Sequence, residues 1–340
     1  MSISRAPLNL RTHFHYDRTI NWFPGHMARG LRQIGEQLHS VDLLVEARDA
    51  RIPLSSVNHN FEKLVQGKDR LIVYNKADLA DPTYEPIVKQ AFAKYLGQKV
   101  LFTNADASVN VRKIIEHAAN KARNDPLRFP YVTVMVVGLP NVGKSSLINA
   151  MRRLGVGRGK AAPTSPLPGY TRSVTGRVKV FEDPRVYLVD TPGVMMPYVE
   201  DPMVGLKMAV TGGIGERATD ESLLADYLLW RLNQFENYSY IDKLNLPIDP
   251  TDNLEEFLPA LAKRIGAIRR GGELDLSAAA RFFLQQYRAG KLGRHTLDDI
   301  HPAWFSSAKV GVSRRQAKKQ AKLEERAKKR KETPLTVHKL

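Results

Sequence analysis

The chain has 340 residues, of which 43% are hydrophobic and 26% charged, and its formal net charge is +17 at pH 7. This length is enough for roughly two domains with buried cores. Cysteine is absent, which excludes disulfides and zinc sites built on cysteine. The most apolar stretches, such as 132–137, are far shorter than the roughly 20 residues of a membrane-spanning helix, so we expect no transmembrane segment.

The first twenty residues differ in composition from the rest. They contain Arg5, Arg11 and Arg18, several hydroxyl residues and no acidic residue before Asp17. Such a composition suits a mitochondrial targeting segment, and it is equally that of a short disordered arm. We therefore expect residues 1–20 to form a targeting or disordered arm.

Six short apolar runs recur through the middle of the chain, with helix-like segments between them. They lie at 41–47, 70–75, 99–103, 132–137, 176–181 and 185–190. Buried strands that alternate with helices predict an α/β fold with a doubly wound, mostly parallel sheet. Ligands bind at the carboxyl ends of the strands in such sheets, and every candidate motif below directly follows one of these runs.

The second run is followed by NKAD at 75–78. The carboxylate of Asp78 can accept hydrogen bonds from the ring N–H and the exocyclic amine of guanine, a pair of donors that adenine lacks. Asn75 and the stem of Lys76 would support this loop and cover the base. Taken alone, the tetrapeptide is also compatible with an ordinary surface turn.

The third run ends in TNAD at 103–106. Its position after the next strand predicts a second base-binding loop, in which Asn104 and Ala105 lie next to the guanine and a backbone N–H meets its O6 atom. This assignment depends on position only.

The fourth run is followed by GLPNVGKSS at 138–146, which matches the phosphate-loop pattern. Glycines allow the backbone N–H groups to face phosphates, and the following helix directs its positive end at them. Lys144 would bridge the β and γ phosphates, Ser145 would bind magnesium, and Ser146 would reach the α phosphate. The nucleotide-binding set predicted in this loop is Asn141, Val142, Gly143, Lys144, Ser145 and Ser146.

Two later loops would sense the γ phosphate. In DTPG at 190–193, Asp190 would hold magnesium through a water and the Gly193 N–H would contact the γ phosphate. Between the phosphate loop and DTPG, PLPGYTRS supplies Thr171, whose hydroxyl would complete the magnesium shell. Loss of the γ phosphate would release such a loop.

The chain thus carries its guanine loops before its phosphate loop, the reverse of the usual order. With NWFPGHMARG at 21–30, DARIPLSSVN at 49–58, GLKMAVTGGI at 205–214 and RFFLQQYRAGKLGR at 281–294, it resembles the circularly permuted GTPases of ribosome assembly, in the bacterial and mitochondrial branch that acts on the large subunit. The resemblance covers roughly residues 20–300. It implies a Ras-like sheet with permuted motif order, followed by a small C-terminal all-α domain.

We accordingly expect a GTPase domain at 21–200, a helical domain at 201–300 and a basic tail at 301–340. Segments 220–232, 254–268 and 276–290 have apolar residues at the helical spacing. Between Arg314 and Lys331 the tail has ten basic and two acidic residues, a net charge of +8. It favours contact with nucleic acid phosphates, and a solubilising terminus is the alternative.

Catalysis is predicted to need outside help. Val194 follows DTPG where many GTPases carry a glutamine that orients the attacking water, so the isolated protein should be slow until a partner completes the site. The resemblance implies that His26 replaces this glutamine. The alternatives are that His26 packs in a turn or contacts RNA. It also implies that Asn141 holds a potassium ion beside the phosphates. The predicted catalytic residues are His26, Lys144 and Thr171.

The resemblance implies a GTP-hydrolysing assembly factor that docks on an immature large ribosomal subunit, contacts its rRNA and ribosomal proteins, and leaves after hydrolysis. The cofactors would be GTP, magnesium and potassium. The arm and tail favour the mitochondrial matrix, with peripheral contact to the inner membrane; the bacterial cytoplasm is the alternative. A catalytically idle RNA-binding scaffold and a P-loop ATPase or kinase are the competing functions.

Overall fold

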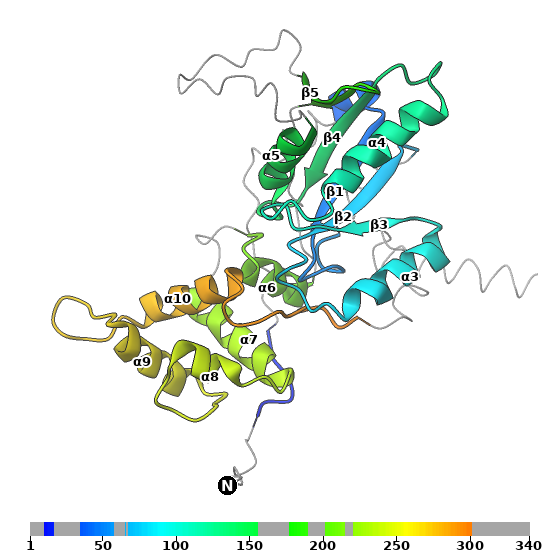
Figure 1. Cartoon of the computed structure of the whole chain (residues 1–340). Coiled ribbons are helices and arrows are strands. Elements are labelled where there is room, and N and C mark those ends of the chain that lie inside the picture. The colour runs from blue at the N-terminus through cyan, green and yellow to red at the C-terminus, as the bar shows by residue number, and fades with distance from the viewer. Residues whose placement is uncertain are drawn as a thin grey trace, which may run out of the picture.

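The computed structural model describes residues 10–16, 35–57, 65, 67–155, 177–189, 201–214 and 220–300. Within these ranges, a sheet with helices on both faces forms one part of the molecule, and a group of helices forms the other (Figure 1).

The sheet has six strands in the order β3-β2-β1-β4-β6-β5. They are β1 (Leu43–Asp49), β2 (Arg70–Asn75), β3 (Val100–Phe102), β4 (Val132–Gly138), β5 (Arg177–Phe181) and β6 (Val186–Val189). All neighbours are parallel except β5 and β6, which are antiparallel. This confirms the predicted doubly wound, mostly parallel sheet and places a strand at each of the six apolar runs.

The centre of the sheet joins two halves of the chain. Strand β1 pairs with β4, which places Ala47 beside Gly138. Gly138 has φ +146°, and a Cβ atom there would lie 2.1 Å from the Ala47 carbonyl oxygen, so only glycine fits. On its other edge β1 pairs with β2, where Asp49 lies beside Asn75. The carboxyl ends of the strands that carry the predicted base and phosphate loops therefore meet at one edge.

Helices cover both faces of this sheet. On one face α4 (Arg112–Asn124) and α5 (Lys144–Gly155) pack against apolar side chains of β1, β2 and β4. On the other face α3 (Tyr84–Leu96) packs Val88 and Phe92 against Tyr74 and Phe102. The central strands are buried almost throughout, as expected for strands covered on both faces.

The second part is helical. After β6, the named elements of the described residues are helices: α6 (Pro202–Val210), α7 (Glu221–Gln234), α8 (Ser239–Leu244), α9 (Leu254–Ile265) and α10 (Leu276–Arg288). Side chains of Asp201, Asp220, Asn253 and Asp275 accept hydrogen bonds from the first-turn N–H groups of α6, α7, α9 and α10, as N-cap residues do. This confirms the predicted C-terminal helical part; its limits at 201 and 300 remain a proposal.

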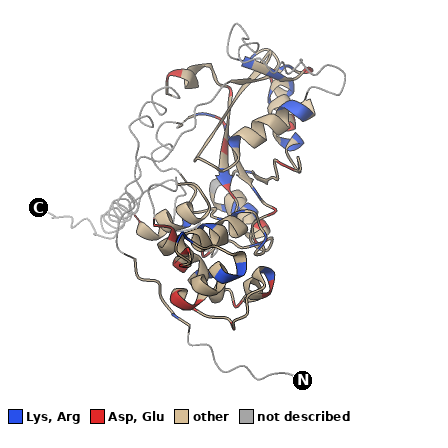
Figure 2. Cartoon of the chain, turned by 90° about the vertical axis from the view of Figure 1, so that its left-hand side faces the viewer, with Lys and Arg blue, Asp and Glu red and all other residues tan. Residues whose placement is uncertain are grey.

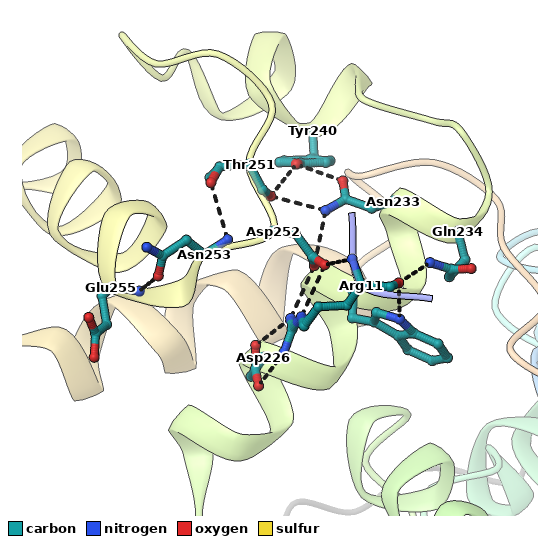
Figure 3. Close-up of polar contacts among 10 residues, drawn as sticks. Arg11, Asp226, Asn233, Gln234, Tyr240, Thr251, Asp252, Asn253 and Glu255 are labelled. Atoms are coloured by element: carbon teal, nitrogen blue, oxygen red, sulfur yellow. Dashed lines mark hydrogen bonds and ion pairs between the residues drawn. The ribbon is translucent and has the colours of Figure 1, made fainter. Parts of the chain in front are cut away.

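An N-terminal segment packs on the helical part. Arg11 forms ion pairs with Asp226 at 2.7 Å and Asp252 at 3.0 Å, and the Trp230 indole N–H donates to the Arg11 carbonyl (Figure 3). The Phe14 ring lies 5.6 Å from the Trp230 ring, centroid to centroid. Within the arm predicted at 1–20, residues 10–16 therefore have defined partners in the helical part, more than 200 residues away in sequence.

No helix in the described ranges combines the length and the apolar character needed to cross a bilayer. The basic tail predicted at 301–340 lies outside the described residues.

Candidate nucleotide-binding site

One buried amide connects three loops. Asn75, at the end of β2, is 2% exposed. Its side-chain oxygen accepts hydrogen bonds from the Ala105 N–H at 3.0 Å and the Thr103 hydroxyl at 3.1 Å, and its nitrogen donates to the Val142 carbonyl at 2.9 Å. The predicted base loops after β2 and β3 and the predicted phosphate loop after β4 are thus fixed to one another through a single side chain.

Lys76 makes a second connection. Its ammonium group donates to the Asn141 carbonyl in the phosphate loop and lies 3.5 Å from the Asp49 carboxylate at the end of β1. Burial lowers the pKa of Lys76. Its backbone has φ +60°, an uncommon conformation for a residue with a side chain, which these contacts hold in place.

The phosphate loop leads directly into α5. Gly143 has φ +91°, and a Cβ atom there would lie 2.2 Å from the Asn75 side-chain nitrogen, so any larger residue would push the loops apart. Helix α5 begins at Lys144, with Ser145 and Ser146 in its first turn, where unpaired backbone N–H groups favour anions. The Lys144 ammonium donates to the Leu139 carbonyl at 2.6 Å, and burial lowers its pKa to about 8.

The base loops also have contacts within and around their own turns. Asp78 is exposed, as a ligand-reading carboxylate must be. The Asn104 side chain accepts from the Ala107 N–H at 2.9 Å within its own turn, and the Ala105 N–H is used by Asn75. The Ala105 N–H therefore helps to fix the loop, and the contact of this loop with the guanine O6 stays a prediction.

The Asn141 side chain contacts a residue outside its own loop. Its side-chain nitrogen donates to the Gly212 carbonyl at 2.6 Å, just after the end of α6, and its backbone has φ +56°. Only the side-chain oxygen of Asn141 can serve as a ligand for a cation, because its nitrogen is a donor.

Four predicted site residues lie outside the described residues: His26, Thr171, Asp190 and Gly193. Val194, after DTPG, lies there too. Of the predicted magnesium ligands only Ser145 is described; it is exposed at the first turn of α5, where a hydroxyl suits magnesium. Within the described ranges, no group of three or more His, Asp and Glu side chains could hold a metal.

Sequence reasoning missed a buried ion pair beside this site. The Arg51 guanidinium lies 2.7 Å from the Asp49 carboxylate. It also donates to the Thr211 carbonyl at 3.0 Å. Burial alone would raise the pKa of Asp49, but Arg51 holds it below its usual range. Both residues lie in DARIPLSSVN, one of the segments on which the family resemblance rests, but the resemblance gave neither residue a role.

A doubly wound sheet whose base and phosphate loops come from opposite halves of the chain, and are fixed together by Asn75, defines a P-loop protein of the GTPase class with permuted motif order. The family model described as "50S ribosome-binding GTPase" matches residues 133–254. The chain is 40% identical to the mitochondrial ribosome-associated GTPase 1 of Mus musculus over 298 residues, which cover 83% of this chain and 91% of the relative.

Two further comparisons agree. Ribosome biogenesis GTPase A of Bacillus cereus is 34% identical over 288 residues, which cover 82% of this chain and 93% of the relative. The crystal structure of GNP-bound YlqF from T. maritima superposes with a TM-score of 0.56 at 25% identity, covering 80% of this chain and 100% of that one. The chain belongs to the family of circularly permuted, ribosome-associated GTPases.

Proposed function

We propose that the protein binds and hydrolyses GTP as an assembly factor of the large mitochondrial ribosomal subunit, and that its nucleotide state controls docking on the particle and release from it. The observation that carries the nucleotide part is the Asn75 side chain, which joins the predicted base loops to the predicted phosphate loop. A single guanine nucleotide can then be held at its base by Asp78 and at its phosphates by Lys144.

Each residue has a defined task in this proposal. Asp78 accepts from the guanine N–H groups, while the first-turn N–H groups of α5 and the ammonium of Lys144 bind the phosphates. Ser145, Asp190 and Thr171 would hold magnesium, which would neutralise phosphate charge, and the Gly193 N–H would contact the γ phosphate.

Completion of the catalytic site is the part for which a partner is needed. His26 orients the attacking water once the particle is bound, and the Asn141 oxygen binds potassium beside the phosphates. Supplied groups of this kind raise the rates of GTPases by up to about 10⁵.

The ribosomal and mitochondrial parts rest on the relatives and on charge. The relatives are named as ribosome-associated and mitochondrial GTPases. Basic residues lie on the helices beside the sheet (Figure 2), and those exposed on α4 and α5 include Arg112, Lys113, Arg152 and Arg153. Such a surface attracts RNA phosphates. We place the protein in the matrix, with peripheral contact to the inner membrane as the finer proposal.

The test is phosphate release from GTP with and without immature large-subunit particles. We expect slow hydrolysis by the protein alone, a stimulation of at least about tenfold by particles, and no hydrolysis of ATP. Lys144→Ala should abolish nucleotide binding, whereas Lys89→Ala, at an exposed ion pair with Glu85 on α3, should not. Nucleotide binding without stimulated release would instead favour an idle RNA-binding scaffold, and ATP hydrolysis would favour an ATPase or kinase.

A further inference from the structure

The chain after α10 runs back from the helical part to the loop that carries Asp78. Arg294 lies on this return segment, residues 290–298. Its guanidinium donates from Nε to the Ala80 carbonyl at 2.9 Å and from Nη2 to the Ala77 carbonyl at 3.0 Å. The two carbonyls lie on either side of Asp78, so one planar side chain spans the base-reading turn.

Two neighbours of Arg294 bind the same loop. The His295 N–H donates to the Leu79 carbonyl at 3.1 Å, and the Thr296 hydroxyl accepts from the Asp81 N–H at 3.2 Å. The return segment therefore binds the backbone of the loop at four positions, 77, 79, 80 and 81, although more than 210 residues separate the partners in the chain.

Gly290 lies close to the Leu79 side chain, next to these contacts. Gly290, at the end of α10, has φ +74°, and a Cβ atom there would lie 2.6 Å from a methyl carbon of Leu79. A side chain at this position would be strained by the backbone conformation, and the Leu79 side chain would have to move.

The return segment is itself held firmly. The His295 ring stacks on Phe235, the residue that follows α7, at 5.3 Å between centroids. Asp298, 2% exposed, accepts from the Leu54 N–H at 2.8 Å and forms an ion pair with Lys207 of α6 at 3.0 Å. The segment thus has fixed anchors on the helical part and beside β1, which makes it a rigid support for the base-reading loop.

We propose that Arg294 and Thr296 are positioning residues for guanine recognition. They hold the Asp78 loop without touching the nucleotide, so that the affinity for guanine depends on how the return segment of the helical domain is seated. A carboxylate that must meet two N–H groups at once is sensitive to small shifts of its backbone. This inference rests on the proposed function, in which Asp78 reads the base.

The test compares GDP with inosine diphosphate, which lacks the exocyclic amine and so offers Asp78 one donor instead of two. With Arg294→Ala we expect the affinity for GDP to fall about tenfold, the worth of one or two hydrogen bonds from a charged donor, and the affinity for inosine diphosphate to fall less. Thr296→Val, of similar shape, should act in the same direction. Arg294→Lys should restore part of the GDP affinity.

The matched control is Arg281→Ala, which removes a part-buried ion pair between Arg281 of α10 and Glu221 of α7 and should leave both affinities unchanged. If the wild type does not prefer GDP to inosine diphosphate or ADP, the proposed function fails. If the wild type prefers GDP but Arg294→Ala and Thr296→Val keep both the GDP affinity and the ratio between the two ligands, the positioning role is overturned. An equal loss of both ligands would also overturn it, because that indicates a general loss of structure.

Discussion

The Asn75 side chain connects the two predicted base loops to the predicted phosphate loop. It is an amide in a buried position, with its oxygen and its nitrogen both used. Buried polar groups that lose their partners cost more than the hydrogen bond itself contributes. The connection between the loops is therefore an all-or-none feature of the site.

Asn75→Ala tests this connection. It leaves the Thr103 hydroxyl, the Ala105 N–H and the Val142 carbonyl unpaired, so we expect nucleotide binding to be lost and the free energy of unfolding to fall by about 3 kcal/mol. Urea unfolding followed by circular dichroism measures the second effect. Asn120→Ala on the exposed side of α4 is the control, with a change of within about 0.5 kcal/mol. A similar small change for Asn75→Ala would show that the loops are held by other contacts.

The pKa of Lys144 gives a prediction for pH. Burial lowers it to about 8 in the free protein, and phosphates beside the ammonium would raise it, because opposite charges favour the charged form. Binding of GTP should therefore take up a proton above pH 8, and the affinity should decrease as pH rises from 7 to 9.5. Calorimetry in buffers of different ionisation heat measures the proton uptake.

Lys144→Arg is the control for this effect, since arginine stays charged throughout that range. The variant should take up no proton at this position, and a wild type without uptake at pH 8.5 would contradict the placement of Lys144 at the phosphates.

At the scale of elements, the sequence predicted what depends on local pattern. All six strands appear in the continuous apolar runs because both faces of the sheet are covered. Helix α8 (Ser239–Leu244) has six residues, too few to show a period, and α6 is apolar on most sides, so neither gave an amphipathic signal. The contacts of Arg294 and Arg51 link positions far apart in the chain, and no local pattern reveals such pairs.

The N-terminal segment was also hidden for this reason. Arg11 is 38% exposed in its side chain, but its partner Asp252 is 5% exposed. Arg11→Ala leaves that carboxylate buried without its cation, and we expect a loss of about 2 kcal/mol in the stability of the helical domain. Native-state hydrogen exchange in α7 and α9 measures this loss locally.

Arg269→Ala is the matched control, because its ion pair with Asp275 is more exposed and surface pairs contribute at most about 1 kcal/mol. Equal protection in the Arg11→Ala variant and the wild type would mean that residues 10–16 do not hold the helical domain.

At the scale of the whole molecule, the end of α6 is a second point, besides the return segment, where the nucleotide loops and the helical part meet. Its last carbonyls and those that follow are bound from three directions. Asn141 of the phosphate loop donates to Gly212, Arg51 after β1 donates to Thr211, and Arg288 of α10 donates to Val210. Because Asn141 of the phosphate loop contacts the residues that follow α6, a change at the phosphates has a route to the helices.

This arrangement predicts that the nucleotide state alters the helical part. If a nucleotide binds with different affinity to two seatings of α6, the seating must in turn depend on the nucleotide. We expect amide exchange at 205–212 and 290–298 to differ between the GDP and GTP-analogue states of the full chain bound to the ribosomal particle. Helix α9 takes part in none of the hydrogen bonds above, so it serves as the internal reference.

Asn141→Ala, compared with the wild type at saturating nucleotide, tests this coupling. The variant removes the only described side-chain hydrogen bond from the phosphate loop to Gly212, so the exchange difference at 205–212 should shrink, while that at 290–298, which depends on the base loop, should persist. Identical exchange in the two nucleotide states of the wild type, alone and on the particle, would show that the helical domain does not respond to the γ phosphate. Release from the particle would then depend on the nucleotide loops alone, because the helices would not change after hydrolysis.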